Sequence, residues 1–431
     1  MCTLHAEAST DPVCLWLPGA RRYRRRMNRV AFLAGATAIA LSMLTPDASS
    51  AERATWRGVD LSYVNELEDC GAQYRDEAGR KDPYAIFAAA GANIVRLRLW
   101  HTPEWTRYST LDDVRKSIRR ARKHGLRVLL DFHYSDDWAH PGKQLVPAAW
   151  RDMDAPDMAA ALGAYTERTL DSLAADGLLP DVVQVGNETN TDLLITEEID
   201  EKTPVRWSRN APFLNAGINA VRRVAQRHDH DIRVMLHVAQ PENVVGWFEG
   251  AVAAGVEDFD LIGVSYYPRW SSTPFEAVGP FVTALRAQFG RDVVIVETAY
   301  PWTLDAEDNA HNLLGEDALV AGYPASIDGQ RRWLMDLQRA VHDAGGLGTV
   351  YWEPGGFPPL ARRAGARART GRMRRYSTLS QEACMPARRF WLPGTEEPRA
   401  PRRGRSSHNR CPEDAGPIPF AMPTTRCPHP P

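Results

Sequence analysis

The chain has only six cysteines in 431 residues, and their positions do not suggest a disulfide framework. A single cysteine, Cys70, lies in the long central part, while the others are Cys2, Cys14, Cys384, Cys411 and Cys427. The C-terminal cysteines lack the paired CxxC and histidine spacing of a zinc site. The central part, in a chain that is 44% hydrophobic, must therefore be stable through an apolar core or a bound ion.

Net charge and long hydrophobic runs are also scarce. A formal charge of -2 gives no electrostatic reason to expect nucleic acid or an anionic membrane as partner. The apolar run 30–44 is too short for a membrane span. It follows the basic stretch 21–26 and precedes Ala48-Ser49-Ser50-Ala51, a pattern typical of a secretory signal cleaved near Ala51.

We therefore predict that residues 1–51 are an N-terminal extension and signal peptide. The signal is predicted at 27–51, with translation beginning at Met27, and residues 1–26 are either an upstream over-extension or an unusually long basic region of the signal. The protein is expected to be secreted or periplasmic. A buried N-terminal helix is the alternative, although nothing amphipathic surrounds the run.

The C-terminal stretch 355–431 is also poor in groups that could form a core. About one third of its residues are Arg or Pro, a composition that predicts a disordered tail. One hypothesis is that the reading frame slips near residue 355. The other is a functional basic tail that binds polyanionic pectin or nucleic acid.

Strand-like and helix-like patterns alternate through residues 52–354. Strands are predicted at 57–61, 94–100, 126–133, 182–185, 232–238, 261–267, 293–296 and 347–352. Helical periodicity occurs between them at 111–125, 159–175, 211–227, 274–289 and 330–344. Eight β/α units in alternation predict an α/β fold, a single (β/α)8 TIM barrel, with the active site at the carboxyl ends of the strands.

Two of the predicted strands end on a glutamate. Glu188 follows Val182-Val183-Gln184-Val185-Gly186-Asn187, and Glu297 follows Val293-Val294-Ile295-Val296. Paired carboxyls on the active face of such a barrel are the groups that a retaining glycosidase needs. Two unrelated surface glutamates are the alternative interpretation.

Other strand ends carry polar and aromatic side chains suited to a sugar. Arg96 and Arg98 share one face of their strand, and we expect at least Arg96 to reach a catalytic carboxylate. A tyrosine of Tyr266-Tyr267 could hydrogen-bond the nucleophile. His133 is another candidate for binding the sugar. Its alternatives are a core histidine and a metal ligand paired with His140. The remaining candidates are Asp136, Trp138, His237, Tyr266, Trp302 and Trp352, and ordinary packing is the alternative for each.

These motifs together resemble the endo-β-1,4-galactanases of glycoside hydrolase family 53. The resemblance rests on 57–62, 96–100, 131–138, 185–188, 263–268 and 297–302, and covers about residues 55–354 in order. It implies a barrel whose acid/base, Glu188, follows Asn187 on the fourth strand and whose nucleophile, Glu297, is on the seventh.

The resemblance further implies a substrate, the β-1,4-galactan of type I arabinogalactan, with Asn187 bonding the sugar 2-hydroxyl. Retention predicts carboxyl groups about 5 to 5.5 Å apart. Alternatives are an enzyme of the same clan acting on mannan, xylan or glucan, and an inactive carbohydrate-binding barrel. We expect a monomer that acts on polysaccharide.

No cofactor is expected to be required for catalysis, but a structural calcium ion is a hypothesis. Family members from bacteria bind calcium through a loop that corresponds to 303–312, which is rich in oxygen ligands here. The candidate ligands are Asp305, Asp308, His311, Asn312 and Asp336. A solvated acidic loop is the alternative.

Overall fold

The computed structural model describes residues 55–69, 72–76, 78–304 and 314–354, and the backbone of 382–384. The predicted signal peptide, nearly all of the predicted tail, and Asp305, Asp308, His311 and Asn312 lie outside the described residues. In the part of the chain that is described, no helix is long and apolar enough to cross a membrane.

Eight parallel strands close into a barrel, in the order β1-β10-β9-β8-β7-β6-β5-β4. The prediction of a (β/α)8 barrel is confirmed, and each predicted strand is present within a few residues of its expected bounds. The strands are β1 (Trp56–Asp60), β4 (Ile94–Leu99), β5 (Arg127–Phe132), β6 (Val182–Val185), β7 (Arg233–Ala239), β8 (Leu261–Ser265), β9 (Asp292–Thr298) and β10 (Gly348–Tyr351).

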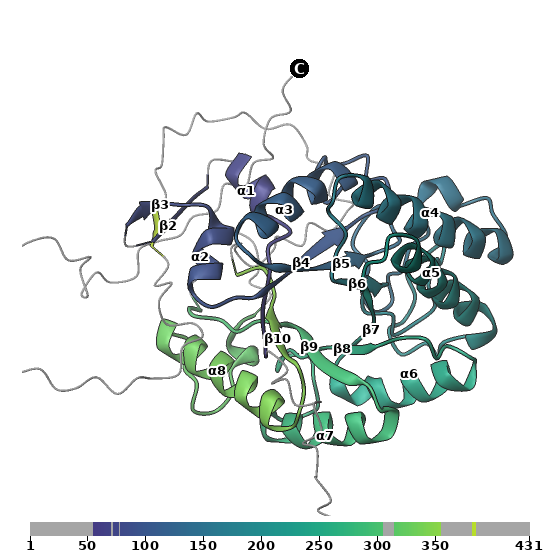
Figure 1. Cartoon of the computed structure of the whole chain (residues 1–431). Coiled ribbons are helices and arrows are strands. Elements are labelled where there is room, and N and C mark those ends of the chain that lie inside the picture. Colours follow the sequence, from purple (N-terminus) through teal and green to yellow (C-terminus); the bar gives the residue numbers. More distant parts are fainter. Residues whose placement is uncertain (1–54, 70–71, 77, 305–313, 355–381, 385–431) are drawn as a thin grey trace, which may run out of the picture. The chain divides into compact units, whose positions relative to one another are not determined.

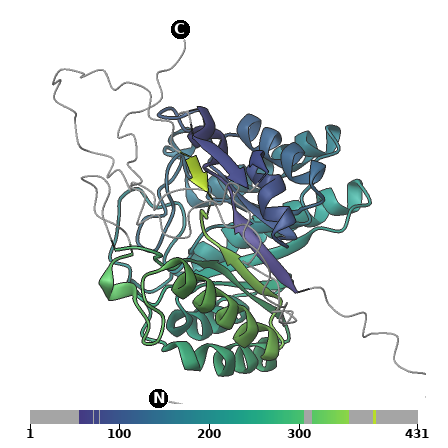
Figure 2. The same cartoon turned by 90° about the vertical axis from the view of Figure 1, so that its left-hand side faces the viewer.

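Helices surround these strands (Figures 1 and 2). They are α1 (Val64–Asp69), α2 (Pro83–Ala89), α3 (Leu111–Lys123), α4 (Ala155–Ala175), α5 (Trp207–Arg227), α6 (Pro241–Ala253), α7 (Val278–Phe289) and α8 (Ile327–Asp343). The helices α1, α2 and α6 were not among the predicted ones. In α6, exposed Val245 and Val252 blur the apolar stripe.

The local sequence explains where the helices begin and end, as α3 illustrates. The Thr110 side chain accepts a hydrogen bond from the Asp113 N–H at the N-terminus. Acidic residues fill the first turn and basic residues the last turn, which complements the helix dipole. Gly125 then adopts a left-handed φ of 72°, which a glycine tolerates at a helix end.

The core has two layers. Apolar residues on the outer faces of the strands pack against the helices, and a smaller cluster that includes Trp56, Met235, Val294 and Val296 packs separately. A single strand contributes side chains to both layers. In β4, Val95, Leu97 and Leu99 belong to the outer layer, and Ile94 belongs to the smaller cluster. Towards the carboxyl ends of the strands the inward positions become polar, and this is where the site forms.

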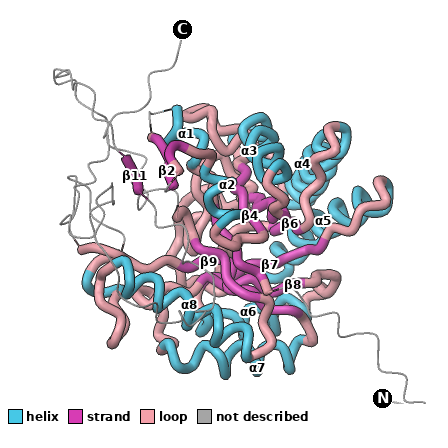
Figure 3. Tube along the Cα trace, turned by 60° about the vertical axis from the view of Figure 1, so that its left-hand side comes forward, coloured by secondary structure: helices cyan, strands magenta, loops and turns pink. Residues whose placement is uncertain are grey.

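A small sheet lies outside the barrel, with strand order β11-β2-β3. Its strands are β2 (Gln73–Asp76), β3 (Gly79–Arg80) and β11 (Glu382–Cys384), and β11 pairs with β2 in parallel (Figure 3). Disorder was predicted for all of 355–431, so this short strand departs from the prediction.

Candidate active site

Glu188 occupies a strained position just after β6. Its φ is 45°, in the left-handed region that a residue with a side chain rarely adopts. Such a conformation costs about 1–3 kcal/mol and persists only where surrounding groups enforce it. Here the Glu188 N–H donates to Nδ1 of His237 at 3.2 Å, and the Glu188 carbonyl accepts from the Asn190 N–H at 2.8 Å.

Glu297 enters the barrel because β9 is irregular. Val294 and Val296 both belong to the same small cluster, so strict alternation would turn residue 297 to the opposite face. The register of β9 against β8 shifts, however, so that Val264 pairs with Ile295 but Ser265 pairs with Glu297. This bulge redirects the side chain, and bulges often have this role beside active sites.

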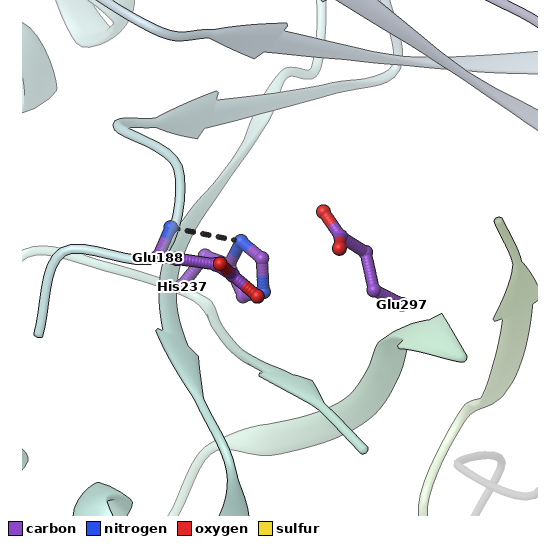
Figure 4. A group of neighbouring side chains, drawn as sticks. All are labelled: Glu188, His237 and Glu297. Carbon is purple, nitrogen blue, oxygen red and sulfur yellow. Dashed lines mark hydrogen bonds between the residues drawn. The ribbon is translucent and has the colours of Figure 1, made fainter. Parts of the chain in front are cut away.

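The two carboxyl groups approach one another closely. One oxygen of Glu188, one oxygen of Glu297 and a ring nitrogen of His237 lie within 4.8 Å of one another (Figure 4). Inverting glycosidases hold their carboxyls about 6.5–9.5 Å apart to admit a water, whereas retaining enzymes hold them about 5–5.5 Å apart. The closest oxygens here are nearer than an inverting pair would place its carboxyls.

Arg96 is the cation that organises the site. It is 2% exposed and forms an ion pair with Glu297 at 2.7 Å. Its guanidinium also pairs with Asp60 at 3.0 Å and with Asp131 at 2.8 Å. The same group donates to Oδ1 of Asn187 at 2.7 Å. Arg96 therefore lies in the carboxylate cluster, as the sequence pattern indicated, and its buried charge is compensated.

The environments of the two glutamates differ. Withdrawal from water, followed by the neighbouring Glu297 carboxylate, raises the pKa of Glu188 to about 8. Withdrawal from water also raises the pKa of Glu297 to about 7, although the Arg96 guanidinium opposes that rise. Because Arg96 contacts Glu297 directly, Glu297 is the first of the pair to ionise and Glu188 retains its proton to higher pH.

His237 links the backbone N–H of Glu188, through Ser265, to the side-chain carboxyl group of Glu188. Because Nδ1 accepts the Glu188 N–H, neutral His237 carries its proton on Nε2. Nε2 is 2.8 Å from Oγ of Ser265, and Ser265 in turn donates to Oε1 of Glu188 at 2.5 Å. Burial, then Arg96, lowers the pKa of His237 well below its usual value, which keeps the ring neutral. His237 thus positions Glu188.

The tyrosine prediction needs a correction at one residue. Tyr267, not Tyr266, donates to Oε2 of Glu297 at 3.2 Å. The hydroxyl of Tyr266 instead donates to the Thr273 carbonyl, and its ring stacks on Trp333 of α8. Since β8 ends at Ser265, the following residues leave the regular pleat, and alternation along the sequence could not say which ring turns inward.

Asp136 and His133 also have different surroundings from those expected of free sugar ligands. Asp136 accepts hydrogen bonds from the N–H groups of Thr102 and Ala148, so it ties two loops together. His133 is 2% exposed, its Nδ1 accepts the Ala139 N–H, and its Nε2 lies 3.0 Å from Asp131. The alternative of a satisfied core histidine describes His133 better.

Asn187 is held from both ends. Its Oδ1 accepts from Arg96, and its Nδ2 donates to the Ala139 carbonyl at 2.9 Å. Trp302 is half-buried on the segment that follows β9. The structure thus brings Asn187 to the carboxylate cluster by contact, whereas Trp302 is placed only at the same end of the barrel.

Aromatic rings form a continuous arc at this end of the barrel. Successive ring centroids are 4.9 to 6.4 Å apart. The order along the arc is Trp105, Trp100, Trp138, Trp352, Tyr267 and Trp270. The two end members are exposed, Trp105 by 43% and Trp270 by 47%. Trp138 and Trp352, both predicted, lie in its centre.

A second buried ion pair supports the arc. Arg98 lies 3.4 Å from the Glu353 carboxylate, and its guanidinium lies 4.0 Å from the ring centroid of Trp138. The rings of Tyr63 and Trp100 are 4.7 and 4.6 Å from the same guanidinium. This cation–π contact fixes the Trp138 ring. Burial, then Asp60, raises the pKa of Glu353 well above its usual value.

Sequence reasoning missed several groups of the site. They are Asp60, Asp131, Gln184, Ser265 and Glu353, all buried. Polar residues inside predicted strands, such as Gln184 in Val-Val-Gln-Val, were the available signal, because a buried polar side chain requires a partner. Gln184 donates to Oδ1 of Asp131 at 2.6 Å and so completes the network.

The same group of side chains is the candidate for binding a metal ion. Among the described residues, Glu188, His237 and Glu297 are the group whose ligand atoms lie close enough to share an ion. Both ring nitrogens of His237 are already hydrogen-bonded, so the trio is not a prepared metal site. Asp336, the described member of the calcium hypothesis, accepts from Tyr323 and pairs with Arg339.

A closed parallel barrel with two facing carboxyls of unequal pKa at the carboxyl ends of its strands defines a retaining glycoside hydrolase. Residues 56–381 match the family model described as glycosyl hydrolase family 53. The chain belongs to this family.

Several relatives of this chain are named as galactanases. An arabinogalactan endo-beta-1,4-galactanase of Cellvibrio japonicus is 47% identical over 320 residues, which cover 74% of this chain and 85% of that protein. An endo-beta-1,4-galactanase of Bacillus subtilis is 33% identical over 314 residues, covering 70% of each chain. Among solved structures, the Ignisphaera aggregans GH53 catalytic domain aligns with a TM-score of 0.64 and 32% identity, covering 70% of this chain and 86% of that one.

Proposed function

We propose that the protein is an endo-β-1,4-galactanase that cleaves the galactan of type I arabinogalactan with retention of configuration. The observation that carries the proposal is the carboxyl pair: oxygens within 4.8 Å, and the higher pKa on Glu188. The galactan substrate is supported by the two relatives described above, which are both named galactanases and match 74% and 70% of this chain.

Each glutamate has a separate role in the two steps. The ionised Glu297 carboxylate attacks the anomeric carbon, while Glu188 gives its proton to the departing glycosidic oxygen. The bond to the leaving sugar breaks as the Glu297–carbon bond forms. In the second step Glu188 takes a proton from water, which attacks the same carbon and releases Glu297. Two displacements on opposite faces give net retention.

Arg96 and Tyr267 prepare Glu297 for its role as nucleophile. Their hydrogen bonds favour the carboxylate form and fix which oxygen points at the sugar. As the covalent intermediate forms, negative charge leaves Glu297, and Asp60 and Asp131 keep Arg96 in place. The cation therefore does not need to move during the reaction.

The rates should depend on pH in a bell shape. Activity requires Glu297 ionised and Glu188 protonated, so kcat/KM should fall below about pH 7 and above about pH 8. The Ser265 hydrogen bond lowers the pKa of Glu188, so Ser265→Ala should move the alkaline limb to higher pH. The measurement is the pH profile of kcat/KM, with Ser326→Ala, at the N-cap position that precedes α8, as the control. An alkaline limb that stays in place or shifts to lower pH would contradict the conclusion that Ser265 lowers the pKa of Glu188.

The exposed ring at one end of the arc should affect long substrates. Trp270→Ala is expected to raise KM for polymeric galactan about 2- to 10-fold, the range given by about 0.5–1.5 kcal/mol of aromatic packing. An aryl galactoside too short to reach Trp270 should keep its KM. Ile327→Ala, at the 53% exposed start of α8, is the control. Equal changes for both substrates would show that Trp270 does not contact the outer chain.

Substrate class is tested by digestion. Linear galactan, mannan, xylan and glucan are each incubated with the protein, and the reducing ends and product lengths are measured. Release of galacto-oligosaccharides from galactan alone is expected. Cleavage of mannan, xylan or glucan instead of galactan would support the alternative within the clan, and no cleavage of any polymer would support a carbohydrate-binding barrel.

Secretion and calcium binding accompany the proposal as predictions. Pectic galactan is an extracellular polymer, so the signal-like segment 27–51 fits the proposed substrate. The calcium hypothesis rests on the composition of 303–312, and its described member, Asp336, already has two partners.

A further inference from the structure

Gln144 lies in the loop after β5 and contacts the peptide that carries the acid/base. It is 2% exposed, and its Nε2 donates to the carbonyl of Asn187 at 2.8 Å and to that of Glu188 at 3.0 Å. A third carbonyl, that of His140, lies 3.2 Å from the same nitrogen. Gln144 thus binds the backbone on both sides of the bond between Asn187 and Glu188.

The backbone of Gln144 is itself anchored. Its carbonyl accepts from the Ile195 N–H at 2.9 Å, and the Ile195 carbonyl accepts from the Val146 N–H at 2.8 Å. Leu145 and Ile195 form an isolated parallel bridge. The loop is therefore attached to the chain just beyond Glu188, which makes Gln144 a rigid support.

The arrangement has a cost that packing alone does not explain. Among the residues that the structure describes, Oε1 of Gln144 has no hydrogen-bond partner, although it is buried. An unpaired buried acceptor costs about 1–3 kcal/mol. Its carboxamide is nevertheless held with the amino group on the two carbonyls, beside the residue whose φ of 45° must be enforced.

We propose that Gln144 is a positioning residue for the acid/base, fixing the left-handed peptide so that the Glu188 carboxyl faces the glycosidic oxygen. The inference rests on the proposed function. His237 restrains the N–H of Glu188, and Gln144 restrains its carbonyl. Being neutral, the carboxamide does this without adding charge beside a group that must stay protonated.

The test is Gln144→Met, which keeps the length of the side chain but donates no hydrogen bond. Two substrates are compared in one preparation: galactan, whose leaving sugar needs a proton, and a dinitrophenyl β-galactobioside, whose leaving group needs none. A misplaced acid should lower kcat on galactan about 10- to 100-fold. For the aryl substrate, kcat/KM should change less than about 3-fold, because Glu297 is unaffected.

The ratio of the rates on the two substrates does not depend on how much of the variant is folded, because both rates scale with the amount of folded protein. Gln338→Met is the matched control, since the Gln338 carboxamide also donates to a backbone carbonyl, that of Trp56, at the opposite end of the barrel. Equal losses on both substrates, or no loss on galactan, would overturn the role of Gln144. If the wild-type protein itself leaves galactan intact, the proposed function fails rather than the role of Gln144. Hydrolysis of the aryl substrate by the wild-type protein then shows whether the two glutamates are active.

Discussion

Replacing Glu297 by Ala should reduce the turnover of galactan by at least about 10⁴-fold, because the covalent route loses its nucleophile. The remaining site should still bind sugar, since Asp60 and Asp131 also hold Arg96, and Trp138 packs against Trp100 and Trp352. KM should therefore change little compared with kcat. Initial rates on linear galactan measure both quantities.

Azide distinguishes loss of the nucleophile from loss of the fold. In Glu297→Ala, the space left by the side chain admits azide, which attacks the anomeric carbon directly and gives an α-configured, inverted product. Glu276→Ala, an exposed carboxyl on the segment before α7, is the control and should keep full activity. Substantial activity of Glu297→Ala without azide would remove Glu297 from the mechanism.

Much of the fold could be predicted because the barrel repeats one pattern. Each apolar strand followed by a helical period is local information, and eight repeats leave closure as the simplest arrangement. Glu188 and Glu297 were identifiable because a carboxyl after a buried strand has few structural reasons to be there. Arg96 was identifiable for the same reason, as a charge on the inner face of β4.

What the sequence could not predict depends on departures from regular geometry. The β9 bulge turns Glu297 inward after Val294 and Val296, and no local residue type marks it. The end of β8 decides that Tyr267 rather than Tyr266 reaches Glu297. Gln144 was not predicted because its partners are backbone carbonyls more than forty residues away. Every residue has a backbone carbonyl, so the sequence does not show which ones a side chain contacts.

Replacing Glu188 by Ala should produce a split between substrates. On galactan the rate should fall about 10²- to 10⁴-fold, the range that general acid–base catalysis contributes. On a dinitrophenyl β-galactobioside, formation of the glycosyl-enzyme should continue, because the phenolate leaves without a proton. Hydrolysis of the glycosyl-enzyme should then be slow, since no base activates the water. The intermediate should accumulate, and the phenolate released as it forms should appear as a burst in stopped-flow absorbance.

Azide should relieve that second step in Glu188→Ala and give a β-configured product, the opposite stereochemistry to that of Glu297→Ala. The Gln144→Met variant should resemble Glu188→Ala in milder form, with a smaller loss on galactan and the same sparing of the activated substrate. Glu249→Ala on α6 is the control. If Glu188→Ala loses both substrates equally, Glu188 is not the proton donor, and another group must protonate the departing oxygen.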